Sequence, residues 1–214
     1  MASTEGIKRD TKTIIWEEAL ALFAQKGYEG VSMRDIAEAV GIKAASLYKH
    51  YQSKEEIFEK IMLEMSGHYN SEMTKIQMPS GDVKKVAEQY MHMSEELLVS
   101  VAKGCYIFFL NDEVARKFRQ MLTIEQYRSS KAGAMFKAFF IEDVLTFQTH
   151  LFETMIERGG FKPCDPHVMA MQFYAPIFLM LTLYDNQEEK KEEGISLLEK
   201  HVRQFARIYS KEED

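Results

Sequence analysis

One short stretch of this chain carries side chains suited to binding a polyanion. Between Ala39 and Lys54 there is no acidic residue, while Lys43, Lys49 and Lys54 supply positive charge and His50 a further donor. The whole chain has a formal net charge of −6, so the window is basic against an acidic background. Screening limits the reach of a charge to about 8 Å at physiological salt, so local charge matters most. On charge alone, a solvated lysine face remains the simpler interpretation.

The pattern around this window predicts two short helices joined by a tight turn. Ser32, with Asp35 three residues later, is typical of a capped helix start, and Gly41 is typical of a helix end. A second short helix is expected over residues 43–51. This makes the pair a helix-turn-helix candidate, and small residues at the start of the second helix suit a groove about 12 Å wide. The apolar residues expected to hold the two helices together are Ile36, Ala37, Val40, Ile42 and Leu47.

The rest of the chain also predicts helices, and no stretch alternates as a strand would. Pro79-Ser80-Gly81 is the clearest break. We therefore expect an all-α fold with a helix-turn-helix domain over residues 1–53, a connecting fourth helix over 54–76, and a larger helical domain over 77–214. The helices expected outside the central pair and this fourth helix cover residues 10–26, 83–102, 112–127, 141–158, 165–184 and 193–209.

Motifs of catalysis and metal binding are missing from the sequence. It has no paired E-x-x-H, no H-E-x-x-H, no glycine-rich phosphate loop and no G-x-S-x-G. Cys105 and Cys164 form neither a disulfide framework nor a zinc pattern. We therefore expect no enzymatic activity, no metal and no cofactor.

The sequence also predicts a cytoplasmic protein without a membrane partner. Residues 1–10 have no apolar region typical of a secretory signal. The apolar run over residues 168–184 contains Gln172 and Pro176 and falls short of the usual spanning length. We interpret it as a buried helix.

Residues 13–60 resemble the DNA-binding domain of the TetR family of transcriptional regulators. The matching residues are dense and lie in the family's order and spacing. Two positions depart from the family pattern: Lys43 stands where Ser or Thr is frequent, and Tyr51 where Phe is usual. The residues that carry the resemblance are Ile14-Ile15, Ala19, Leu22-Phe23, Gly27-Tyr28, Val31-Ser32, Ile36-Ala37, Val40-Gly41-Ile42, Ser46-Leu47-Tyr48, His50-Tyr51 and Ser53-Lys54-Glu55.

The resemblance implies a double-stranded DNA operator as partner. Base-facing residues would then be Lys43, Ala44, Ala45 and Ser46, in the major groove. Phosphate contacts would come from the other members of the set, with the start of the second helix binding a phosphate through its N–H groups. The candidate DNA-binding residues are Ser32, Met33, Lys43, Ala44, Ala45, Ser46, Tyr48, Lys49, His50 and Lys54.

The resemblance further implies a homodimer whose last two long helices form a four-helix bundle with those of a second chain. An independent reason is that residues 168–184 are apolar on nearly every side, so the chain itself can cover one face and a partner the other. An ordinary central core helix is the alternative. The candidate interface residues are Phe173, Ile177, Met180, Leu198, Val202, Phe205 and Tyr209.

The larger domain is rich in methionine and aromatic residues, which adapt to apolar ligands of varied shape. Core packing explains any single one of them, but together they indicate a small apolar or aromatic effector. The expected function is therefore a repressor that its effector releases from a pseudo-palindromic operator. The alternative is a helix-turn-helix protein controlled by a protein partner, without a small-molecule effector. The candidate pocket residues are Tyr90, Met93, Phe108, Phe109, Met121, Tyr127, Phe147, Met155, Tyr174 and Phe178.

Overall fold

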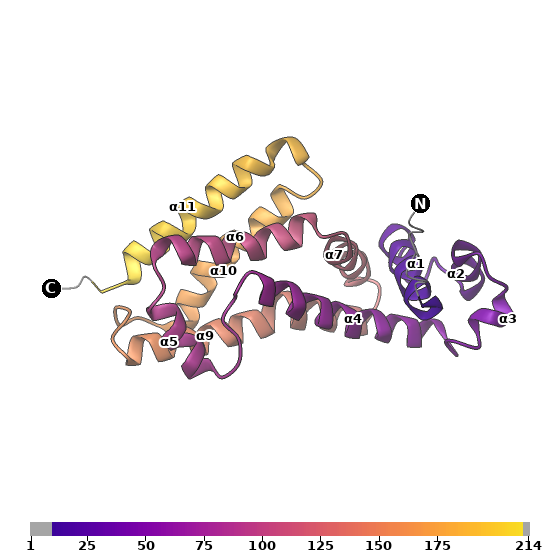
Figure 1. The fold of residues 1–214 in the computed structure, drawn as a ribbon, viewed down its shortest axis with the longest axis horizontal. Coiled ribbons are helices and arrows are strands. Elements are labelled where there is room, and N and C mark those ends of the chain that lie inside the picture. Colours follow the sequence, from indigo (N-terminus) through magenta and orange to yellow (C-terminus); the bar gives the residue numbers. More distant parts are fainter. Residues whose placement is uncertain (1–9, 212–214) are drawn as a thin grey trace, which may run out of the picture. The chain divides into compact units, whose positions relative to one another are not determined.

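The computed structural model describes residues 10–211, and within them the secondary structure is helical apart from one isolated bridge between Phe161 and Ser210 (Figure 1). This confirms the expected all-α fold. In chain order the elements are α1 (Thr11–Lys26), α2 (Met33–Val40), α3 (Ala44–Leu47), α4 (Lys54–Lys75), α5 (Val83–Met91), α6 (Glu95–Asn111), α7 (Glu113–Glu125), α8 (Ser130–Lys137), the π-helical η1 (Ala138–Glu142), α9 (Asp143–Glu157), α10 (Pro166–Leu183), the 3-10 turn η2 (Glu188–Lys190) and α11 (Lys191–Tyr209).

The chain forms two compact units. The N-terminal unit comprises Met1–His68 and Arg116–Gly133, and the C-terminal unit comprises Tyr69–Ala115 and Ala134–Asp214. The packing therefore adds residues 116–133, from the middle of the chain, to the N-terminal helices. The division by function after residues 53 and 76 stays a prediction, because packing does not report which residues bind which partner.

The helix-turn-helix of the N-terminal unit follows from its capping residues. The Ser32 hydroxyl accepts a hydrogen bond from the Asp35 N–H at 3.2 Å, and the Asp35 carboxylate accepts one from the Ser32 N–H at 2.7 Å. At the other end of α2, Gly41 adopts a φ of 76° and the Ile42 N–H donates to the Ala37 carbonyl at 2.9 Å. This Schellman turn ends α2 and directs the chain into α3.

The core of the N-terminal unit draws on every one of its first four helices. Tilted and edge-on ring pairs join Phe23, Tyr28 and Phe58, with Phe23–Tyr28 and Tyr28–Phe58 centroids both 5.3 Å apart. The buried apolar side chains of this core include Ile15, Ala19, Leu20, Phe23, Val31, Ile36, Ala37, Leu47, Tyr51, Ile57, Phe58 and Ile61.

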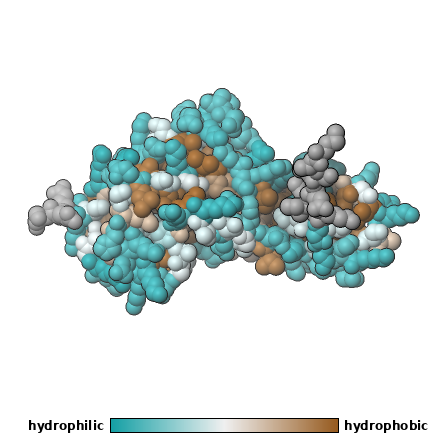
Figure 2. Space-filling model, in the orientation of Figure 1, coloured by the Kyte–Doolittle hydropathy of each residue, from teal (hydrophilic) through white to brown (hydrophobic). Residues whose placement is uncertain are grey.

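The C-terminal unit contains two apolar clusters that both involve α10 and α11. One cluster joins α5, α9, α10 and α11 around Phe152 and Phe205. The other joins α6, α10 and α11 around Tyr106 and Leu198. Figure 2 shows apolar surface over α6, α10 and α11, bordered by hydrophilic side chains.

The structure corrects three predicted helices. The helix expected over residues 83–102 is broken, because the Ser94 hydroxyl accepts the Leu97 N–H and starts a new helix, α6. The helix expected over 141–158 begins earlier, with α8 and η1 preceding α9. The helix expected over 43–51 is α-helical only from Ala44 to Leu47, and turn-type hydrogen bonds continue to Tyr51.

Within residues 10–211, one helix is long and apolar enough to satisfy a length-and-hydropathy criterion for a membrane span. This helix is α10, with a mean hydropathy of 1.3 over 18 residues. A single helix of this kind is weak support for a membrane span, because core helices of water-soluble proteins meet the same criterion. Here α10 buries Met169, Ala170, Met180 and Leu181 inside its own unit.

We predict that two glycines with equally open surroundings respond oppositely to alanine. An added Cβ meets nothing within 4 Å at Gly41 or at Gly67. Gly41 has the left-handed φ of 76°, so Gly41→Ala should destabilise the protein by roughly 1–2 kcal/mol. Gly67 lies inside α4, so Gly67→Ala should stabilise it by roughly 0.5–1 kcal/mol. Urea unfolding of both variants measures these changes, and shifts of the same sign would contradict the assignment of the turn.

Candidate DNA interface

The short helix α3 packs one face against the core of the N-terminal unit and exposes the opposite face to solvent. Leu47 is fully buried against the core, at 0% exposure. The remaining side chains of the helix and its flanks are exposed or half-buried. Those exposed are Lys43, Ala45, Tyr48 and Lys49, and those half-buried are Ala44, Ser46 and His50.

This surface combines small residues with positive charge at its edges. Lys43 occupies the N-cap position of α3, and Ala44 and Ala45 form the first turn. Tyr48 exposes 47% of its surface, so its phenol is available to an outside acceptor such as a phosphate. An arrangement of small side chains between donors is compatible with insertion of α3 in a major groove.

Ser32 and Met33 mark the start of α2. Ser32 is exposed, and its hydroxyl donates to the Asp35 carboxylate at 2.6 Å. This hydrogen bond lowers the pKa of Asp35 below its ordinary value. The N-cap role expected from the sequence is confirmed, while phosphate binding by Ser32 and Met33 stays a prediction.

The structure gives Lys54 a role inside the protein that the sequence did not suggest. Its Nζ donates to the Tyr28 carbonyl at 2.6 Å and to the Val31 carbonyl at 2.9 Å. The same ammonium lies 4.1 Å from the centroid of the Tyr28 ring, in cation–π geometry. Two of its three donors are thus used within the N-terminal unit, which leaves one for a phosphate.

Tyr28 is also bound from a distant part of the sequence. Its N–H donates to Oε1 of Glu125 at 2.8 Å, across 97 positions of the chain. Glu125 lies at the end of α7 and is buried, at 1% exposure. Both backbone polar groups of Tyr28, its N–H and its carbonyl, are therefore bound by side chains, and this fixes the loop between α1 and α2.

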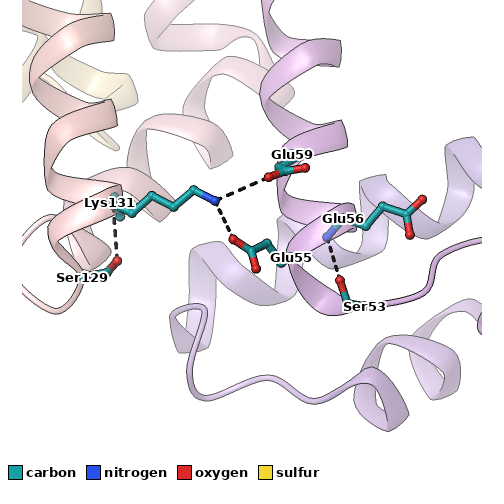
Figure 3. Close-up of polar contacts among 7 residues, drawn as sticks. Ser53, Glu55, Glu56, Glu59, Ser129 and Lys131 are labelled. Atoms are coloured by element: carbon teal, nitrogen blue, oxygen red, sulfur yellow. Dashed lines mark hydrogen bonds and ion pairs between the residues drawn. The ribbon is translucent and has the colours of Figure 1, made fainter.

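A second long-range link joins α8 to the start of α4 (Figure 3). Nζ of Lys131 lies 2.5 Å from Oε1 of Glu55 and 3.5 Å from Oε1 of Glu59. On the other side of the α4 start, the Ser53 hydroxyl accepts the Glu56 N–H at 3.1 Å. The Lys131 ammonium lowers the pKa of Glu55. Because the ion pairs are exposed, each contributes little to stability.

The predicted pocket residues fall into both units. Met121 and Tyr127 belong to the N-terminal unit, where Met121 is fully buried and Tyr127 is 90% exposed. So exposed a tyrosine does not line an internal pocket, which corrects the prediction for Tyr127. The other eight lie in the C-terminal unit and are buried or half-buried: Tyr90, Met93, Phe108, Phe109, Phe147, Met155, Tyr174 and Phe178.

Aromatic side chains from four helices form a chain of ring contacts in the C-terminal unit. Phe108 and Phe109 pair with each other and with Tyr69, at centroid distances of 5.1–6.0 Å. Phe109 continues to Phe140, and the Tyr174 hydroxyl donates to the Phe140 carbonyl at 2.6 Å. These contacts bring part of the predicted pocket set together.

Protonated polar groups lie among these rings. Burial raises the pKa of the Cys105 thiol to about 12 and that of Tyr90 to about 12. It also raises the pKa of Tyr69 and Tyr174, and the charge of a Cys105 thiolate would raise all three phenols further. These four groups are therefore neutral near pH 7.

The predicted dimer residues lie mostly inside their own chain. Met180, Leu198, Val202 and Phe205 are 1–7% exposed within the two apolar clusters, so they pack mainly inside their own chain, and a part of theirs in an interface stays a prediction. Phe173, Ile177 and Tyr209 are half-buried and pack against the same clusters. The exposed large apolar residues of α10 and α11 are instead Val168, Met171, Leu179, Leu183, Leu197 and Ile208.

A family comparison agrees with the geometry of the N-terminal helices. Residues 15–61 match the model of bacterial regulatory proteins of the tetR family. The match covers 47 of the 214 residues and assigns a TetR-type segment to this part of the chain. The matched TetR segment contains α2, α3 and the first part of α4, together with the predicted base-facing residues.

Two curated relatives match this chain over a short stretch of comparable length. The biofilm operon icaADBC negative transcriptional regulator IcaR of Staphylococcus epidermidis is 51% identical over 49 residues, which are 23% of this chain and 26% of IcaR. IcaR of Staphylococcus aureus strain Newman is 49% identical over 49 residues, with the same coverage. The match therefore spans about a quarter of the length of these relatives.

Solved structures extend the TetR likeness to the whole fold. A TetR-family regulator from Mesorhizobium loti has a TM-score of 0.68 at 21% identity, covering 94% of this chain and 97% of that chain. The SmeT–triclosan complex has a TM-score of 0.67 at 18% identity, covering 95% and 93%. At these identities the likeness establishes the fold and no more.

We predict that Lys54 stabilises the TetR-type domain more than other lysines on its surface. Lys54→Met removes donors from two backbone carbonyls and should cost about 1–2 kcal/mol of unfolding free energy. Lys49→Met, at an exposed position near α3, should change it by less than about 0.5 kcal/mol. Chemical unfolding of the two variants tests this, and equal stabilities would show that the Lys54 ammonium does not hold the loop.

Proposed function

We propose that this chain is a ligand-responsive transcriptional repressor that binds a pseudo-palindromic DNA operator as a homodimer. The observation that supports DNA binding best is the outward surface of α3, with small residues between lysines and a buried anchor at Leu47. In this proposal Lys43, Ala44, Ala45 and Ser46 face the bases, and the remaining predicted residues bind phosphates. A protein that acts on DNA in this way works in the cytoplasm of a bacterial cell.

Repression is supported by the relatives with the same DNA-binding segment. IcaR of Staphylococcus epidermidis is a negative transcriptional regulator. Its likeness to this chain covers 49 residues, about a quarter of either protein, so we carry over the direction of regulation and not the target genes.

A small uncharged effector suits the interior of the C-terminal unit. The phenols of Tyr69, Tyr90 and Tyr174 and the Cys105 thiol stay protonated near pH 7, so this interior offers hydrogen-bonding groups without formal charge. Aromatic rings beside them offer apolar contacts. The complex of SmeT with triclosan is an example of this fold with a small aromatic molecule.

Effector binding would release DNA by a shift between two states. A ligand changes such an equilibrium only by as much as its affinity differs between them. In the DNA-bound state the two recognition helices of a dimer must lie about 34–36 Å apart to read successive major grooves on one face. We propose that the effector favours a state without this spacing.

The two faces of α10 support dimer formation. One face buries Met169, Ala170, Met180 and Leu181 in the chain's own core. The opposite face exposes Val168, Met171, Ala175, Leu179 and Leu183, which recur at helical spacing. An exposed apolar stripe of this kind is typical of a protein–protein interface, and a second copy of α10 and α11 would cover it.

We predict that two exposed lysines contribute differently to DNA binding. Lys49→Ala should weaken binding to all duplexes and reduce the slope of log Kobs against log salt by about 0.9, the loss of one phosphate contact. Lys43→Ala should change the preferred base at one position of each half-site, with a discrimination of about 1–3 kcal/mol. Fluorescence anisotropy with the DNA upstream of its own gene and selection from random duplexes measure the two effects. Equal loss on every sequence for Lys43→Ala would contradict its base-facing role.

We predict that a charge on the exposed face of α10 separates the dimer. Leu179 is 57% exposed, so Leu179→Glu should fold but place like charges together at the interface and give the mass of one chain in light scattering. Leu63 is 66% exposed on α4, and Leu63→Glu serves as the matched control that should keep the mass of two chains. A Leu179→Glu variant that stays dimeric would overturn this choice of interface.

A further inference from the structure

The turn between α7 and α8 contacts the chain on both sides of the helix-turn-helix. Before α2, the Tyr28 N–H donates to Oε1 of Glu125 at 2.8 Å. After α3, the ammonium of Lys131 lies 2.5 Å from Oε1 of Glu55, at the start of α4 (Figure 3). All of these residues belong to the compact N-terminal unit. A segment from the middle of the chain therefore contacts the residues that lead into α2 and those that follow α3.

The contact before α2 is closely packed. Gly27 adopts a φ of 77°, and a Cβ added there would lie 2.5 Å from Oε1 of Glu125 and 2.5 Å from Nη1 of Arg128. The same Cβ would lie 3.5 Å from Cγ2 of Ile124. The two shorter distances leave no room for a side chain, so the end of α7 lies directly against the loop between α1 and α2.

The turn that follows Glu125 fixes the backbone of this residue. Its carbonyl accepts hydrogen bonds from the N–H groups of Arg128 and Ser129, each at 3.0 Å. The Ser129 hydroxyl in turn accepts the Ala132 N–H at 3.3 Å, in the first turn of α8. Because Glu125 is also 1% exposed, its carboxylate offers the Tyr28 N–H an acceptor at a defined position.

The two contacts of this turn differ in strength. The Lys131–Glu55 pair has side chains 54% and 60% exposed, so solvent screens it. The Glu125 carboxylate is buried, and hydrogen bonds to a charged acceptor are the stronger kind. Arg128 Nη1 lies 3.6 Å from its Oε1, while Oε2 is buried without a hydrogen-bond partner in residues 10–211. A buried carboxylate bound at one oxygen adds little net stability, so its effect is expected in the position of the loop.

From these contacts we infer that Glu125 is a positioning residue for DNA recognition, although it lies outside the matched residues 15–61. Its carboxylate fixes Tyr28, four residues before Ser32, the N-cap of α2. It thereby sets the direction in which α2 and α3 leave the core. The inference rests on the proposed DNA binding, and it adds that the surface of α3 needs this contact from α7 to bind tightly.

Two substitutions of similar size separate the hydrogen bond from the charge. Both Glu125→Gln and Glu125→Met remove the negative charge, but only Gln keeps an oxygen for the Tyr28 N–H. The probe is a duplex that the unmodified full chain selects from a random pool. We expect Glu125→Met to raise Kd by about tenfold or more, because binding must then order the loop, and Glu125→Gln to stay within about threefold. Lys131→Met, in the same turn, should also stay within about threefold.

The salt dependence distinguishes positioning from a direct contact with DNA. No phosphate contact is lost in Glu125→Met, so the slope of log Kobs against log salt should stay unchanged. Stoichiometric titration gives the active fraction of each variant, so that Kd refers to folded protein. A smaller slope for Glu125→Met would show that Glu125 acts on the DNA contacts themselves and would overturn the inference.

Hydrogen exchange without DNA tests the positioning independently of DNA binding. In Glu125→Met, the amides of residues 28–42 should exchange at least about fivefold faster, while those of α10 and α11 keep their protection. Glu125→Gln should exchange as the unmodified chain does. If the unmodified chain bound no duplex, the proposed function would fail, and the exchange over residues 28–42 would still decide whether Glu125 positions the loop.

Glu125→Asp is the second variant if Glu125→Met fails to fold by circular dichroism. It keeps the charge but shortens the side chain by one methylene, which withdraws the acceptor from the Tyr28 N–H. It should therefore raise both Kd and the exchange over residues 28–42. The inference is overturned if either quantity stays unchanged in the variants that lose the contact, or if Glu125→Gln weakens binding as much as Glu125→Met. Equal acceleration of exchange in both units would also overturn it, because that reports a general loss of stability.

Discussion

The N-terminal unit depends on how the backbone of Tyr28 is held. Its N–H donates to the buried carboxylate of Glu125, and its carbonyl accepts from the ammonium of Lys54. Its ring packs between Phe23 and Phe58. The loop between α1 and α2 is thereby fixed to α4 and to the end of α7, and the N-cap of α2, Ser32, lies four residues after Tyr28. Loss of this anchor would let the α2–α3 surface move relative to the core that presents it.

Local sequence patterns predicted the helix-turn-helix well because its determinants lie within a few residues. The Ser32–Asp35 capping box and the left-handed Gly41 are each complete within one helix end, so spacing alone reveals them. The same logic failed over residues 83–102, where apolar periodicity continued through His92–Ser94 although the Ser94 cap starts a new helix. An N-cap residue such as Ser94 favours the start of a new helix, while the apolar spacing around it favours one continuous helix. The sequence pattern is compatible with both outcomes.

The contacts between residues far apart in the chain could not be predicted from the sequence, because no local pattern marks the residues that form them. The Glu125–Tyr28 bond spans 97 positions, and the Lys131–Glu55 pair spans 76. Neither involves a residue type that is unusual for an exposed helix. For α11, the apolar periodicity correctly identified Leu198, Val202 and Phe205 as one face of the helix. Such an apolar face is needed equally for packing in the chain's own core and for packing against a partner. The structure assigns that face to the core.

Hydroxyl-radical footprinting on duplexes selected by the full chain tests the central proposal most directly. If two copies of α3 enter successive major grooves, two protected regions related by two-fold symmetry should appear on one face of the DNA. Their centres should lie about 10 base pairs apart or at a multiple of that spacing, and protection should weaken as salt is raised. Absence of salt-sensitive protection on any selected duplex, or a single protected region without symmetry, would contradict the account.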